Sequence, residues 1–271
     1  NGYSITSSYS GTYSGSGAIH ISGGAPTFNN LTMSDNSIEK VGDGSFDVRG
    51  GLMYVEDSAI VTIQNSNFTN NIMDYENQAI RGGAFYIDSS NVTIHNSSFI
   101  GNASSTSGSS EGAILYGDQN SHVELTNVII SGNSSISSTY SNNNIIHFNN
   151  NGSLTVEESV VRDNAGTAIF INGNMTAEGS VISSNNNGGI VGTGALNLKT
   201  THLDSNSTEN SGGAIQFAGT IVTDNIKVRG NQAQKGGAVQ LFGSLTSDSS
   251  LFSGNSASNT GGGVLLQRSL L

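Results

Sequence analysis

Aromatic, histidine and acidic side chains recur at similar positions in successive short segments of the chain. Aromatic faces can stack on sugar rings, and neighbouring carboxylates can bind sugar hydroxyls. The candidate glycan-binding stripe is His20, Tyr54, Tyr86, His147 and Phe170, with Glu56, Asp57, Asp88 and Asp118 close behind it. Leu115 interrupts this stripe, and Gly192, Gln216 and Gln240 continue it. We favour the interpretation of these residues as a cross-strand ladder that only stabilises an exposed sheet, with the binding surface as the alternative.

The same carboxylates raise the question of polysaccharide cleavage. That chemistry needs two converging carboxylates or a calcium-assisted arginine base. Glu157, Glu158 and Asp224 fall at turns, and no Asp-Asp pair or Gly-His-Gly segment is present. The histidines fall in different columns, and the chain has no cysteine. We expect no catalytic residue, metal or cofactor, and a polysaccharide lyase or hydrolase is the alternative function.

The elements that carry these residues are repeats, each built around an asparagine. An apolar residue stands three positions before this anchor, as Phe68 stands before Asn71. Because the anchor falls at a turn, we expect its side-chain amide to stack on the next one. The predicted asparagine column is Asn36, Asn71, Asn102, Asn133, Asn164, Asn185, Asn206, Asn231 and Asn255.

Apolar residues alternate with polar ones before each anchor and after each Gly-Gly-Ala segment, which predicts three short strands per repeat. The strand after the glycines has two inward residues, such as Phe85 and Ile87. We assign Ile114 with Tyr116, and Val191 with Thr193, to the same positions. A single repeat cannot bury its apolar face, so the repeats must stack as coils of a parallel β-helix. The stretch between the anchor and the glycines is expected to be a surface loop of variable length.

The fold class is therefore all-β, a single-stranded parallel β-helix or β-solenoid. About ten coils spaced by about 4.8 Å predict a rod roughly 50 Å long. Gly-Gly-Ala at residues 82–84, 212–214 and 236–238, with Phe-x-x-Asn at Phe68, Phe99 and Phe252, resembles the repeat of the chlamydial polymorphic outer-membrane proteins. It resembles more broadly the pectin-lyase-like β-helices. The resemblance implies a right-handed helix and a secreted or surface-displayed, adhesin-like stalk, outside the cell or on its surface.

We expect one domain over residues 1–271 with incomplete coils at both ends. Ile5, Thr6 and Ser7 fit the second-strand position, Gly15 the anchor position, and Leu270 the start of another second strand. Unpaired strand edges invite pairing, and a head-to-tail contact that does not close gives a filament. The expected partners are copies of the chain stacked head to tail, or further repeats of the same chain, and possibly glycans.

Charge and composition exclude other partners. With 9 Lys and Arg and a net charge of −11, the chain lacks the basic clusters that bind nucleic acid. No apolar stretch is long enough to span a membrane.

Nine Asn-x-Ser/Thr sequences are present, and the register sorts them. Asn102, Asn133 and Asn206 are anchors, which we expect to be buried. The candidates for glycosylation are Asn67, Asn91, Asn151, Asn174, Asn30 and Asn96.

Overall fold

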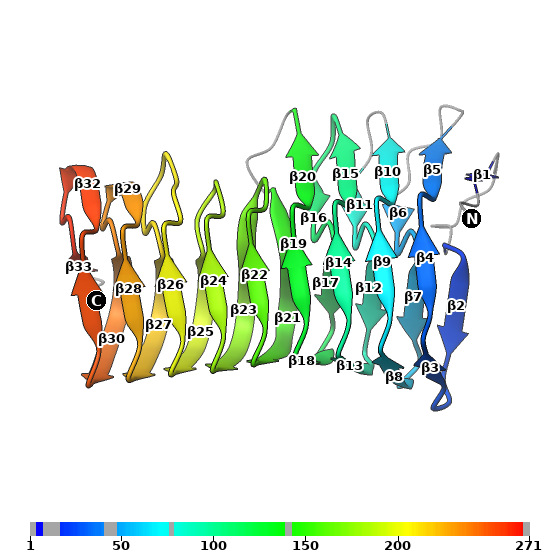
Figure 1. The fold of residues 1–271 in the computed structure, drawn as a ribbon, viewed down its shortest axis with the longest axis horizontal. Coiled ribbons are helices and arrows are strands. Elements are labelled where there is room, and N and C mark those ends of the chain that lie inside the picture. The colour runs from blue at the N-terminus through cyan, green and yellow to red at the C-terminus, as the bar shows by residue number, and fades with distance from the viewer. Residues whose placement is uncertain (1–3, 8–16, 41–47, 76–78, 139–142, 268–271) are drawn as a thin grey trace.

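The computed structural model describes residues 4–7, 17–40, 48–75, 79–138 and 143–267. Within these ranges the chain forms short strands that pair in parallel, and no helix. Coils follow one another along the long axis of the molecule (Figure 1). The predicted all-β parallel β-helix is confirmed. No described segment is a helix that could cross a membrane.

The strand after each glycine pair and the second strand lie next to each other in one sheet. A corner separates them in the first coils, whereas they form one continuous strand from β21 onward. The first strands are β2 (Ile19–Ser22), β7 (Met53–Glu56), β12 (Phe85–Asp88), β17 (Leu115–Asp118) and β33 (Val264–Gln267). The second strands are β3 (Thr27–Asn29), β8 (Ile60–Gln64), β13 (Asn91–His95) and β18 (His122–Thr126). The merged strands are β21 (Asn144–Glu157), β23 (Thr167–Glu178), β25 (Ile190–Lys199), β27 (Ile215–Asp224) and β30 (Val239–Asp248).

The strand before each anchor forms a second sheet along the rod. Its apolar middle residues point inward, and Phe68 and Phe99 are fully buried there, with stacked rings 4.6 Å apart. Phe252 is half-buried because its coil is the last that the structure describes in this sheet. The strands are β4 (Thr32–Ser34), β9 (Asn67–Thr69), β14 (Ser98–Ile100), β19 (Ile129–Ser131), β22 (Val160–Arg162), β24 (Val181–Ser183), β26 (His202–Asp204), β28 (Lys227–Arg229) and β31 (Leu251–Ser253).

Two of the predicted inward pairs are wrong by one residue. Phe85 pairs with Leu115, so Leu115 and Gly117 face inward in place of Ile114 and Tyr116. The reason is that Gly112, with φ of +68°, is the counterpart of Gly82, with φ of +66°.

The second error arises at residues 188–190, where Gly-Gly-Ile stands in place of Gly-Gly-Ala. Ile190 pairs with Ile169 and Ile215, so Ile190 and Gly192 face inward. Val191 takes the outer position that we had assigned to Gly192, and Thr193 is exposed.

The segments between anchor and glycines are strands in the first coils, which corrects the prediction of plain surface loops. Met73, Tyr75 and Ile80 are buried among them, with Val48 packed against this small core. Figure 1 shows most of these strands along the first half of the rod. One column is β1 (Ser4–Ser7), β5 (Ser37–Lys40), β10 (Ile72–Tyr75), β15 (Ala103–Thr106) and β20 (Ser134–Ser137), and the other is β6 (Val48–Arg49), β11 (Ile80–Arg81) and β16 (Ser110–Glu111). In later coils β29 (Gln232–Lys235) pairs with β32 (Ser256–Thr260).

The position of β1 differs from the prediction. Ile5 pairs with Ile38 of β5, so this segment continues the column that follows the anchors and not the second-strand column. Gly15 and Leu270 lie outside the described residues.

Candidate binding surface

Six rings form one column on the outer side of the first-strand sheet. The rings from Tyr54 to His147 have centroids 5.0–5.2 Å apart and interplanar angles of 1–22°. His20 meets Tyr54 edge-on, and Phe170 follows His147 at 4.4 Å. Tyr116 stands where we had placed Leu115, which makes the column continuous. The column, called the ring ladder below, is His20, Tyr54, Tyr86, Tyr116, His147 and Phe170.

The expected exposure of this column is wrong for its inner members. Tyr54, Tyr86 and His147 are 8%, 0% and 3% exposed, because neighbouring rings occupy both of their faces. A sugar cannot stack on a face that another ring already covers. Only His20, which is exposed, and Phe170, which is half-buried, present ring surface to solvent.

Two arginines, which the sequence interpretation missed, cover the outer edge of the ladder. Arg49 Cζ lies 5.0 Å from the centroid of Tyr86, and Arg81 Cζ lies 5.9 Å from that of Tyr116. Arg81 Nε also pairs with Glu111 Oε2 at 3.1 Å. Each arginine directly precedes a glycine turn, so its side chain reaches the tyrosine of the following coil. Their position before the glycines is the sequence signal that could have identified them.

The hydroxyl groups of Tyr86 and Tyr116 have partners inside the fold, whereas Nε2 of His147 is buried without one among the described residues. Tyr86 Oη donates to Asp118 Oδ2 at 3.1 Å, and Asn149 Nδ2 donates to Tyr116 Oη at 3.1 Å. Burial raises the pKa of Tyr86 and of Tyr116. Burial lowers the pKa of His147 to about 4. The rings of Tyr86, Tyr116 and His147 are therefore uncharged near neutral pH.

The acidic residues near the ladder take part in turn contacts. Asp88 and Asp118 are register neighbours on adjacent strands. Asp118 accepts hydrogen bonds from Tyr86, Asn150 and the backbone of Gln119, whereas Asp88 accepts one from Ser89.

The remaining acidic side chains do not converge on one site. Glu56 pairs with His20 at 2.7 Å, and Asp57 accepts a hydrogen bond from Ser22. Glu157 and Asp224 share a register column in which Lys199 lies between them, and Glu158 is exposed at the corner. No cluster of three His, Asp or Glu side chains suited to a metal occurs in the described ranges.

The anchor asparagines form the predicted column. The eight anchors from Asn36 to Asn231 are buried, and Asn255 is half-buried. In every adjacent pair, the Nδ2 and the backbone N–H of one anchor both donate to Oδ1 of the next. The amides therefore hold each coil in register with the following coil.

The sequons divide as the register predicts. Asn102, Asn133 and Asn206 are buried in the anchor column. All six candidate sites are exposed: Asn30, Asn67, Asn91, Asn96, Asn151 and Asn174. Their glycosylation stays a prediction, and sugar found on Asn133 by glycopeptide mass spectrometry would contradict the register.

Comparisons with known proteins find no match: no family profile, curated protein or solved structure is significantly similar to the chain.

Proposed function

We propose that the protein is an extracellular, non-enzymatic structural rod of the adhesin type. It is extended end to end by copies of itself or by further repeats of the same chain. The observation that carries the proposal is the uninterrupted register of the asparagine column through every coil from Asn36 to Asn255. A column of this kind can continue into another coil without any change of geometry.

The apolar columns at the end of the rod support this proposal. Leu241 is fully buried, whereas Leu266, its register neighbour in the last strand that the structure describes, is 59% exposed. Val228 is likewise fully buried, and its neighbour Phe252 is only half-buried. One more coil would cover this apolar surface, and its burial favours association.

The other end of the rod offers the matching positions. Ile19 and Ile21 of β2 belong to the same inward columns as Val264 and Leu266 of β33. In a stacked copy, β2 would therefore pair with β33, and β4 with β31. The parallel register that joins all described coils would then continue across the junction.

The location outside the cell rests on the adhesin-like resemblance and on the exposure of the six candidate sequons. A non-enzymatic role is supported by the acidic side chains, which bond to neighbouring turn groups. Polysaccharide cleavage remains the competing proposal. Release of reducing ends or unsaturated products from pectin or alginate would replace our proposal with that one.

Light scattering after size-exclusion chromatography, with negative-stain imaging, tests the association. We expect rods longer than one chain, and Leu266→Lys should shorten them because it places a charge in an apolar column. Leu251→Lys is the matched control, since Leu251 is 48% exposed in the final coil but belongs to an outer column. A monomer at every concentration, or equal loss in both variants, would count against end-to-end pairing.

A further inference from the structure

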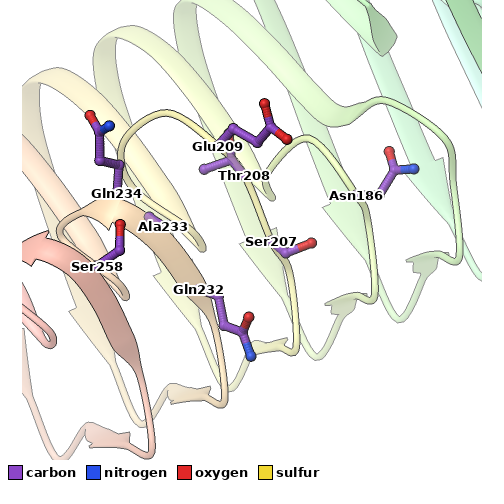
Figure 2. Close-up of a pocket in the computed structure, with 8 residues that line it drawn as sticks. All are labelled: Asn186, Ser207, Thr208, Glu209, Gln232, Ala233, Gln234 and Ser258. Atoms are coloured by element: carbon purple, nitrogen blue, oxygen red, sulfur yellow. The ribbon is translucent and has the colours of Figure 1, made fainter.

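Two adjoining grooves lie along the later coils, on the side where the first coils carry their additional strands. One has a volume of about 490 Å³ and the other about 470 Å³. Asn186 and Glu209 line both grooves, so the two form one trough across successive coils. Ser135 and Ile136 of β20 form the wall at which the additional strands end. The larger groove is lined by the loop residues Asn186, Ser207, Thr208 and Glu209 and by side chains of β29 and β32 (Figure 2).

The side chains in this trough have unused hydrogen-bonding groups. Asn186, Ser207, Glu209, Gln232 and Gln234 make no side-chain hydrogen bond within the described part of the chain.

The anchor asparagines differ from the amides of the trough, because each anchor Oδ1 from Asn71 to Asn255 accepts two hydrogen bonds. At the far end of the trough, Asn143 Oδ1 is buried without a donor among the described residues. The trough therefore offers amide donors and acceptors that a ligand can pair with.

Charge narrows the class of ligand. Glu209 is the one charged side chain among the described residues that line the grooves. An anionic polysaccharide would meet this carboxylate with no lysine or arginine in the lining to balance it. Ile136 is the one large apolar side chain in the described lining, and the other aliphatic ones, Ala165 and Ala233, are small, so a hydrophobic ligand gains little.

We propose that the trough binds a neutral oligosaccharide lying along the rod axis. Sugar hydroxyls pair with amide and hydroxyl groups, and they need no counter-charge. Coils repeat about every 4.8 Å. A pyranose unit is of similar length, so successive sugars would meet successive loops. Binding here does not depend on association of the rod ends, because the trough lies along the side of the coils.

The test uses the full chain and a panel of cello-, xylo-, manno- and malto-hexaose, with hexagalacturonate as the charged comparison. Protein NMR or calorimetric titration should detect at least one neutral hexaose and no hexagalacturonate. The variant Asn186→Ala/Gln232→Ala should weaken that binding at least tenfold. The control variant Asn197→Ala, which replaces an exposed asparagine of β25 outside the trough, should not.

Three outcomes of these titrations would overturn the proposal. They are no binding of any neutral hexaose, preferred binding of hexagalacturonate, and equal weakening in the control variant. Circular dichroism and thermal unfolding of each variant establish that the fold is intact.

Discussion

A buried anchor such as Asn133 uses every hydrogen-bonding group of its side chain. Its Oδ1 accepts from the backbone and side chain of Asn102 at 2.9 and 3.0 Å. Its Nδ2 donates to Phe99 O at 3.0 Å and to Asn164 Oδ1 at 3.1 Å. Only a carboxamide of this length has both the donors and the acceptor. Aspartate lacks the donors, and serine is too short.

We therefore expect Asn133→Ala to be strongly destabilising. The change removes the acceptor of two buried N–H groups of Asn102 and one donor to the Phe99 carbonyl, and a buried group left unsatisfied costs about 1–3 kcal/mol. Urea unfolding should show a loss of several kcal/mol, whereas Asn197→Ala on the exposed face should cost less than about 0.5 kcal/mol. Similar stability of the two variants would mean that the asparagine column does not hold the coils together.

His147 predicts a pH dependence of stability. Its pKa is about 4 in the fold and about 6.5 in an unfolded chain, because burial in the ring ladder disfavours the imidazolium. The unfolded state therefore binds the proton first, so stability is fully present above about pH 6.5 and is lost as the pH falls toward 4. The loss is about 3 kcal/mol. Denaturant midpoints measured from pH 7 to pH 4 should show this slope in the wild type but not in His147→Phe.

The matched control for that experiment is His202→Phe, because His202 lies on the outer side of β26, away from the ladder. This variant should keep the slope of the wild type. A slope that survives in His147→Phe would assign the pH dependence to other groups.

At the scale of the strand, the sequence predicts most of the register and fails where the glycine motif is degenerate. Phe68 and Phe99 have identical spacing to their anchors, so their column is correctly predicted. Gly112 is followed by Ala113, and alignment of that alanine with Ala84 shifts the strand by one residue. The decisive property is the positive φ of Gly112, which only the backbone reveals.

The inward position of Gly117 makes this register testable. A Cβ added at Gly117 would lie 2.3 Å from Cε1 of Phe148, the next residue in its column. Gly117→Ala should therefore destabilise the protein by about 1–3 kcal/mol. Phe148→Leu should relieve the clash, so the double variant should be more stable than the sum of the two single changes predicts. Simple additivity in denaturant unfolding would place Gly117 outside the core.

The additional strands and the covering of the ring ladder could not be predicted from the repeats. Both depend on segments whose length and composition vary between coils. Met73 and Ile80 fill the small core of one coil, but Ser104 and Ser110 occupy the corresponding positions of the next coil and hydrogen-bond to each other at 2.6 Å. A column that changes from apolar to polar gives no periodic signal. The exposure predicted for Tyr86 failed for the same reason, since Arg49 covers it from such a segment.

At the scale of the whole molecule, each coil touches only its two neighbours, so stability spreads along the rod and the end coils are the least supported. The first half carries two further columns of strands, and the second half carries the open trough. In the first half, Arg49 and Arg81 of the additional strands cover part of the ring ladder. In the second half, side-chain amides such as those of Asn186 and Gln232 are exposed.

The net charge of −11 gives end-to-end association a definite salt dependence. Two such rods repel each other over about 30 Å at 0.01 M salt but only over about 8 Å at 0.15 M. The contacts proposed at the ends are apolar side chains and backbone hydrogen bonds, which salt screens little. Sedimentation velocity should therefore show longer assemblies as ionic strength rises. Assemblies that shorten with added salt would indicate a junction built on ion pairs, and the apolar columns ending at Leu266 would not be the contact.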